Sequence, residues 1–274
     1  MKFNPLLFVI YISVALLVTP SSYAIERATE YLRTLEETNI SVGLEYDQGD
    51  FGTDQTSYYF QVPLSISYRK NDYLLELWVP FAATNATTEN IIVGAPERGG
   101  GPPAPPTSSI ETQETDEYGL GDIFLVATYF LPSRTRSEYS VTGIIKLGTA
   151  DRDKLLGTGE NDYALEGGFS TPVGKTHLFG ALGYQLTGDP PGVDLNNIFY
   201  GRIGNALPLH NNREVGLSLY LSEPLAAGRQ SFTELDVFYT TMLSRNRRLY
   251  SYFRKGFTDS SPDWGLGIRY TYRY

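Results

Sequence analysis

The feature that most constrains this chain is an alternation of apolar and polar side chains that returns in segment after segment. In residues 264–274 (WGLGIRYTYRY), every second side chain is aromatic or aliphatic, and glycine, threonine and arginine fill the positions between them. Successive residues of a strand point to opposite faces, so this pattern predicts a β-strand with one apolar and one polar face. Residues 57–69 and 73–82 repeat the pattern on either side of a short polar turn, which predicts a hairpin.

The same period of two divides the chain into about twelve candidate strands. They lie near 39–46, 57–69, 73–82, 119–131, 138–148, 162–171, 177–187, 198–207, 215–223, 232–243, 249–257 and 264–274. Each is close to the ~9–11 residues that a tilted strand needs to cross a bilayer, and the total is even. Short connections alternate with longer ones rich in Gly, Pro and Asp.

Two all-β architectures accommodate such strands. A soluble sandwich or barrel would pack the apolar stripes into a core, whereas a barrel in a membrane would turn them outward. Short turns on one side and longer loops on the other are typical of outer-membrane barrels. We therefore expect a transmembrane up-and-down antiparallel β-barrel of about twelve strands, with short periplasmic turns and longer extracellular loops.

The N-terminus predicts export. Lys2 precedes an apolar run at 6–18, and small residues follow up to Ala24, so we interpret residues 1–24 as a cleavable signal peptide. An uncleaved anchor is the alternative, but the run is shorter than the ~20 residues of a spanning helix. Residues 25–38 would form a periplasmic or lumen-plugging segment, residues 39–274 the barrel, and residues 83–118 a long external loop with a Gly/Pro-rich tip.

The composition of the chain excludes several classes of protein and of binding partner. The chain has only one long apolar run and an ordinary hydrophobic content of 41%, which together exclude a polytopic helical membrane protein. The absence of cysteine excludes a disulfide framework. A net charge of −9 argues against nucleic acid as a partner. The 21 tyrosines suit a boundary between lipid and water. The expected outer loops are acidic, with Asp47, Asp50 and Asp151 among them. They would attract cations at the mouth, simply solvate the surface, or hold divalent cations among lipopolysaccharide phosphates.

The polar faces of the expected strands carry charged and aromatic side chains that a barrel would turn inward. The lumen-lining or selectivity candidates are Glu45, Glu76, Trp78, Asp122, Lys146, Asp162, Glu166, Arg202, Tyr220, Glu234, Asp236 and Arg269. Phe179, Tyr200 and Phe238 would narrow the same lumen. Pairing Leu131 with Ser137 sets Asp122 opposite Lys146, and closing the barrel sets Arg269 opposite Glu45. We expect such pairs mainly to neutralise charge in a narrow lumen.

No catalytic, cofactor-binding or metal site is predicted. The two histidines, His177 and His210, lie near expected periplasmic turns, where neither fits an outer-membrane hydrolase. The glycines lack the strand-to-helix context of a phosphate-binding loop. Calcium binding by the acidic residues of 151–162 is an alternative to an exposed acidic loop.

Segments 118–131 (YGLGDIFLVATYFL), 144–170 and 261–267 (SPDWGLG) resemble the outer-membrane β-barrel family named for the meta-pathway of phenol degradation. The similarity covers most of 118–274 and, more weakly, 39–82. The chain departs from the family at 148–151, which lacks the usual proline, and at Tyr274, where phenylalanine is usual. The resemblance implies an outer-membrane channel or transporter for small aromatic or hydrophobic compounds.

These observations lead to an ordered set of expectations. The first is a passive channel for a small solute in the outer membrane, in contact with lipid and lipopolysaccharide. The strand that ends at Tyr274 would be recognised by the barrel-assembly machinery. The alternative is a structural or surface-interaction barrel that acts through the 83–118 loop, and an outer-membrane hydrolase comes third.

Overall fold

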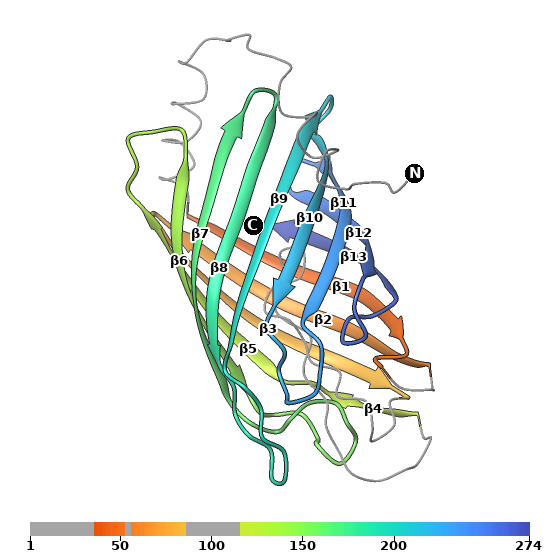
Figure 1. Cartoon of the computed structure of the whole chain (residues 1–274). Coiled ribbons are helices and arrows are strands. Elements are labelled where there is room, and N and C mark those ends of the chain that lie inside the picture. The colour runs from red at the N-terminus through yellow and green to blue at the C-terminus, as the bar shows by residue number, and fades with distance from the viewer. Residues whose placement is uncertain (1–35, 53–55, 86–115) are drawn as a thin grey trace, which may run out of the picture.

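The structure is a computed structural model that describes residues 36–52, 56–85 and 116–274 (Figure 1). The expected signal peptide, most of the 25–38 segment and the Gly/Pro-rich part of the 83–118 loop lie outside these residues. Within them, no helix is long and apolar enough to cross a membrane.

The described residues form thirteen strands. They are β1 (Glu37–Gly49), β2 (Ser57–Lys70), β3 (Tyr73–Thr84), β4 (Glu117–Leu120), β5 (Ile123–Leu131), β6 (Glu138–Leu147), β7 (Asp162–Val173), β8 (Thr176–Leu186), β9 (Ile198–Leu209), β10 (Arg213–Ser222), β11 (Phe232–Ser244), β12 (Arg247–Gly256) and β13 (Trp264–Arg273). The period-two pattern placed each expected strand within a few residues of these bounds.

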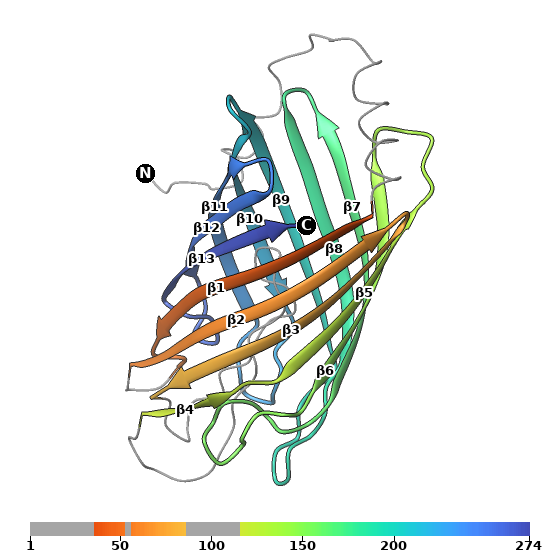
Figure 2. The same ribbon diagram turned by 180° about the vertical axis from the view of Figure 1, so that it is seen from behind.

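The sheet closes on itself. Neighbouring strands pair antiparallel, and β13 pairs with β1, so the described strands form a closed barrel in which the short β4 pairs with β3 alone. β4 and β5 both pair with β3 and follow each other along it. Counted as one interrupted strand, they make the thirteen strands a closed barrel of twelve. Figures 1 and 2 show its opposite walls, with β7–β10 in front in the first and β1–β3 in the second.

The interruption between β4 and β5 lies opposite Pro80 of the neighbouring strand β3. Pro80 on β3 has no N–H to donate to its neighbour, so the ladder cannot continue regularly there. The N–H of Gly121 still donates to the Pro80 carbonyl at 2.9 Å, while the N–H of Ile123 turns to the Thr149 hydroxyl at 3.1 Å. Asp122, between them, is fully buried and accepts from the N–H of Ala150 at 2.9 Å.

The two faces of the wall differ as the alternation predicts. On the outer face, aliphatic and aromatic side chains such as Leu64, Leu165 and Leu182 are more than half exposed. On the inner face, charged and polar side chains such as Glu45, Lys146 and Arg254 are buried. A soluble barrel would show the reverse, so the outer face is built to meet hydrocarbon. Closure also satisfies the backbone groups that hydrocarbon could not.

Both expected registers are wrong by two residues. Leu131 pairs with Tyr139 instead of Ser137, and Arg269 pairs with Gly43 instead of Glu45. A shift of two keeps every side chain on its face, whereas a shift of one would reverse all of them. The expected ion pairs therefore still form, along diagonals of the sheet.

Candidate functional site in the barrel lumen

The candidate site is the lumen, where the structure places every residue predicted to line it. All of the twelve predicted residues are buried except Glu76 and Arg202, which are partly buried. Most of them belong to three ionic clusters near the end with the longer connections or to a cavity toward the end with the short turns, and Tyr220 belongs to an apolar cluster at the mouth.

The first cluster surrounds Arg254 on β12. Its guanidinium donates two hydrogen bonds to Asp236 on β11, at 2.9 and 3.1 Å. Its Nη1 also donates to both carboxylate oxygens of Asp47 on β1, at 3.0 and 3.4 Å. The carboxylate of Glu234 lies 3.2 Å from the same guanidinium. Arg254 is fully buried, and charge-assisted bonds of this kind are what allow an ion to be buried.

The second cluster surrounds Lys146 on β6. Its ammonium lies 2.8 Å from Asp162 and 3.6 Å from Asp122, and it donates to the Thr158 hydroxyl at 2.8 Å. Because Thr158 belongs to the connection between β6 and β7, the cluster ties that connection to the barrel wall. The side-chain amide of Gln185 donates to Asp162 at 3.2 Å.

The third cluster contains Arg269 and Glu45, 2.9 Å apart. Glu45 also accepts from the side-chain amide of Gln61 at 2.7 Å. The Arg269 guanidinium lies 4.6 Å from the ring centroid of Trp78 on β3, which is a cation–π contact over the inner face of β1 and β2. The three clusters together hold six carboxylates and three cations. The carboxylates are Glu45, Asp47, Asp122, Asp162, Glu234 and Asp236, and the cations are Lys146, Arg254 and Arg269.

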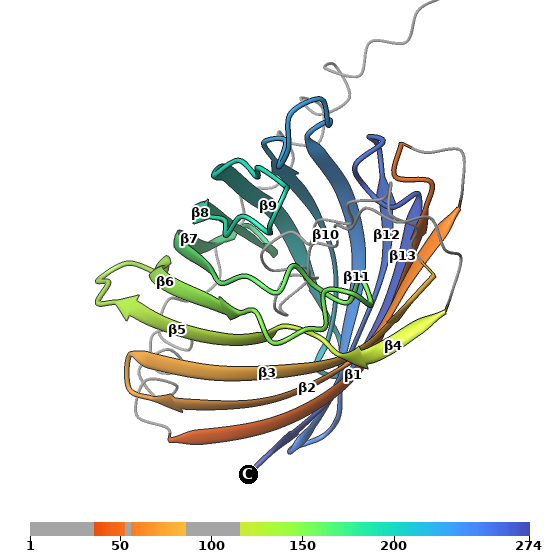
Figure 3. The same ribbon diagram turned by 90° about the horizontal axis from the view of Figure 1, so that it is seen from below.

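Apolar side chains of the connections close the same end of the barrel. Figure 3 shows the connection between β6 and β7 lying across the opening. Its Leu155 and Leu156 are buried against Phe51, Tyr59 and Ala82. Leu155 has a φ of 58°, a left-handed conformation that costs a branched side chain about 1–3 kcal/mol.

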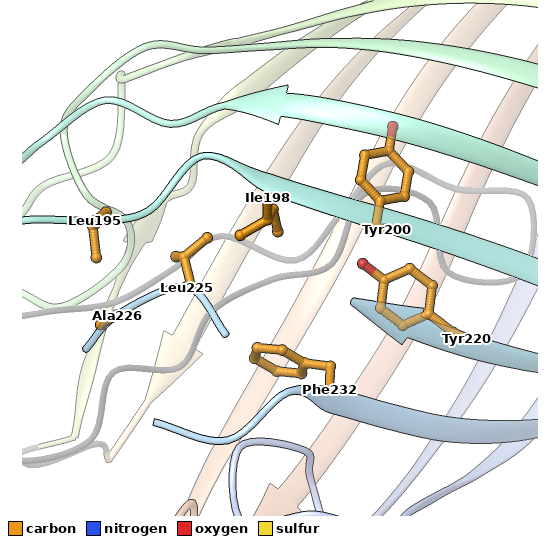
Figure 4. Close-up of a cluster of buried hydrophobic side chains, with 7 residues drawn as sticks. All are labelled: Leu195, Ile198, Tyr200, Tyr220, Leu225, Ala226 and Phe232. Carbon is orange, nitrogen blue, oxygen red and sulfur yellow. The ribbon is translucent and has the colours of Figure 1, made fainter. Parts of the chain in front are cut away.

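A second apolar cluster lies on the other side of the mouth. Figure 4 shows Leu195, Ile198, Tyr200, Tyr220, Leu225, Ala226 and Phe232, which come from β9, β10, β11 and the connections beside them. The two connections also form an isolated bridge between Leu195 and Ala226. The predicted lumen residue Tyr220 thus belongs to the packing of the mouth, where it stacks on Tyr200 with ring centroids 6.4 Å apart.

A cavity of 230 Å³ opens in the lumen toward the short turns. Its polar lining includes the predicted residues Glu76, Glu166 and Arg202, and its apolar lining includes Phe130 and Phe179. The remaining lining residues are Leu74, Thr128, Glu138, Ser140, Thr142, Gly168, Phe169, Ser170, Gly180 and Ala181. A mixed lining of this kind, with a few polar groups among apolar ones, is typical of a site for a small molecule.

Two hollows elsewhere do not belong to the lumen. The larger, of 580 Å³, lies on the outer face, where Ala127 and Gly143 leave space among exposed residues such as Leu75 and Leu125. Among the described residues, no group of His, Cys, Asp and Glu is arranged to hold a metal ion. Asp162, one of the residues considered for calcium, binds Lys146 instead.

The sequence prediction missed Arg254 and misplaced Asp47. Arg254 shares its face with Tyr250 and Tyr252, and the period of two alone would have placed it inside. Asp47 was assigned to an acidic outer loop, but β1 extends to Gly49 and buries Asp47 beside Arg254. The alternation of apolar and polar residues does not continue clearly at Asp47, because polar residues and glycine follow it at 48–50. The sequence therefore did not indicate that the strand continues past Asp47.

Comparisons with known proteins show the fold. No protein-family model matches the chain, and no curated protein matches it closely enough to be counted a relative. Among solved structures, it is similar to an outer-membrane channel from Pseudomonas putida F1, with a TM-score of 0.68 and 14% identity over 94% of this chain and 100% of that chain. An anion-selective porin from Comamonas acidovorans has a TM-score of 0.39 and 11% identity over 88% of this chain and 98% of that one.

At such low identity, the likeness to the Pseudomonas putida channel shows that the two chains share a β-barrel fold. The resemblance to the family of the phenol meta-pathway is not confirmed by these comparisons.

Proposed function

We propose that the protein is an outer-membrane channel that passes small aromatic or hydrophobic solutes by passive diffusion. The observation that carries the proposal is the closed barrel with an apolar outer face, a charged inner face and a lumenal cavity of 230 Å³. An engineered cavity of about 150 Å³ holds benzene. A solute with one ring therefore matches the size of this cavity.

At the other end of the lumen, the described connections are packed by buried apolar side chains. The connections that carry Leu156 and Leu225 pack tightly over the mouth, so passage requires these connections to move. Connections on a barrel rim are the part of the fold that can open without breaking the sheet. The proposed route therefore runs through the mouth, past the ionic clusters and into the cavity.

Localisation and partners follow from the same proposal. Export by the N-terminal segment, contact with lipid and lipopolysaccharide, and assembly through the strand that ends near Tyr274 all belong to a protein of the outer membrane. No enzyme chemistry is proposed.

Liposome swelling with refolded mature chain tests the proposal. We expect phenol-sized solutes to enter faster than they enter empty liposomes, and larger sugars to be excluded. The variant Ala181→Phe fills the cavity and should slow entry. Ala127→Phe is the matched control, because Ala127 is exposed on the outer face. Entry rates no higher than those of empty liposomes for every small aromatic compound and sugar would refute a channel function.

A further inference from the structure

Four lumenal aromatic rings lie directly opposite glycines on the neighbouring strand. The cross-strand pairs are Phe179 with Gly204, Tyr200 with Gly183, Phe238 with Gly216, and Tyr252 with Gly267. Side chains of a strand normally stand roughly perpendicular to the sheet. A glycine opposite the ring removes the neighbour that would hold the ring upright.

Distances show that each ring uses this space. A Cβ atom at Gly204 would lie 2.3 Å from Cζ of Phe179. At Gly216 it would lie 2.2 Å from Cζ of Phe238, and at Gly267 it would lie 2.3 Å from Cε1 of Tyr252. These separations are far below van der Waals contact, so the rings lie over the glycines and against the wall. Aromatic cover of a strand glycine is a known way of stabilising a sheet.

The pair of Phe179 and Gly204 lies beside the cavity. Phe179 lines the cavity, and one side of its ring is held against Gly204. The ring of Phe238 meets it at a centroid distance of 6.1 Å and an interplanar angle of 56°. The Phe179 ring therefore contacts Gly204 and Phe238, and it adds an apolar surface to a cavity lining that also contains Glu166 and Arg202.

We propose that Phe179, seated on Gly204, is a specificity-determining residue of the cavity and favours a planar ring over a puckered ring of the same size. This inference rests on the proposed channel function and adds the selective surface to it. A planar solute can stack on the exposed ring face over its whole area, whereas a puckered ring touches it with only part of its atoms. Gly204 is the positioning residue that keeps the ring flat.

Phenol and cyclohexanol form a suitable pair of probes, since they share a six-membered ring and one hydroxyl and differ in planarity. Both would be measured by entry into liposomes and by equilibrium binding to the full mature chain in detergent. The wild-type protein should prefer phenol, and Phe179→Leu should lower that preference by about two- to tenfold. Gly143→Ala should leave it unchanged, because a Cβ at Gly143 meets nothing within 4 Å.

Gly204→Ala tests whether Gly204 positions the Phe179 ring. This variant should push the ring into the cavity and weaken the binding of both probes. A Cβ there would also lie 2.7 Å from the carbonyl oxygen of Leu217, so strain in the strand could produce the same loss. The double variant Gly204→Ala with Phe179→Leu separates the causes. Recovery of binding in the double variant supports displacement of the Phe179 ring. A loss of binding as large as that of Gly204→Ala alone would assign the loss to strand strain and refute the role of Gly204 in positioning the ring.

The two proposals fail in different ways. Binding that prefers phenol and depends on Phe179, without entry into liposomes, would refute the channel and leave the selective surface standing. Entry of both probes at rates that Phe179→Leu does not change, with no preference in binding, would refute the selective surface and leave the channel standing.

Discussion

Removal of Arg254 is the sharpest test of how the lumen is held together. In Arg254→Met, three buried carboxylates lose the cation that lies within 3.2 Å of each of them. Breaking a buried ion pair from one side costs about 3–5 kcal/mol. Because three partners are left instead of one, we expect a loss near the upper end, about 5 kcal/mol. A loss of that size approaches the whole stability of many domains, which is about 5–15 kcal/mol.

Neutralising the three carboxylates should restore much of the stability that Arg254→Met removes. If uncompensated negative charge causes the destabilisation, then Arg254→Met combined with Asp47→Asn, Glu234→Gln and Asp236→Asn should recover much of it. Neutral groups cost far less to bury than charges without a partner. The matched control is Arg245→Met, since Arg245 is exposed in the turn between β11 and β12.

The assay is urea unfolding of the refolded barrel in lipid vesicles, followed by tryptophan fluorescence. Trp78 is a suitable reporter because it is buried in the lumen against Arg269. Arg245→Met should unfold with the wild type. A single Arg254→Met variant within about 1 kcal/mol of the wild type, or a neutralised variant no more stable than the single one, would refute the electrostatic account.

Three further predictions concern the ends of the barrel. Leu156→Ser should loosen the connection between β6 and β7, because Leu156 is fully buried at the mouth. Single-channel recordings should then show a higher conductance than the wild type. Unchanged conductance would count against closure of the barrel by this connection. Lys146→Met should make residues 148–161 more sensitive to limited proteolysis, because it removes the bond to Thr158, and equal cleavage of both proteins would contradict this. At the opposite end, a hydrogen bond from Tyr68 and the nearby Lys70 lower the pKa of the exposed Glu36 carboxyl. Tyr68→Phe should raise the pKa of Glu36 toward its ordinary value, so that Glu36 takes up its proton at a higher pH than in the wild type. NMR titration measures this pKa. An unchanged pKa of Glu36 would show that the hydrogen bond from Tyr68 does not cause the shift.

The excess of carboxylates over cations in the three ionic clusters also bears on transport. A low-dielectric passage lined by net negative charge raises the local concentration of cations. In a salt gradient across a bilayer that contains the protein, we expect the reversal potential to have the sign of a cation-selective channel. A reversal potential with the sign of an anion-selective channel would contradict the proposed route past these clusters.

Much of the fold could be predicted from the sequence because a strand has a simple period. The alternation in residues 57–69 and 264–274 fixes which side chains share a face, whatever the partner strand. Membrane solvation then decides which face points outward, and the lumen candidates Glu45, Lys146 and Arg269 followed from that choice. The turn asymmetry added which end carries the longer connections.

Register could not be predicted to better than two residues. Residues on one face repeat every second position, so pairings that differ by two bury the same set of side chains and look equivalent in sequence. The break at Gly121 and Asp122 depends on Pro80 in a different strand, and no local pattern announces it.

The alternation of side chains, by itself, determined the number of strands, their faces and the chemistry of the inner and outer surfaces. Only the tertiary structure decided that Asp47 and Arg254, 207 residues apart, form one ionic cluster, that Leu156 reaches Tyr59 across the mouth, and that Phe179 lies on Gly204 beside a cavity. The physical reason is that the period of a strand is a property of neighbouring residues in the chain. A contact across a closed barrel depends on register, curvature and the path of the connections, and these are settled by all the strands together.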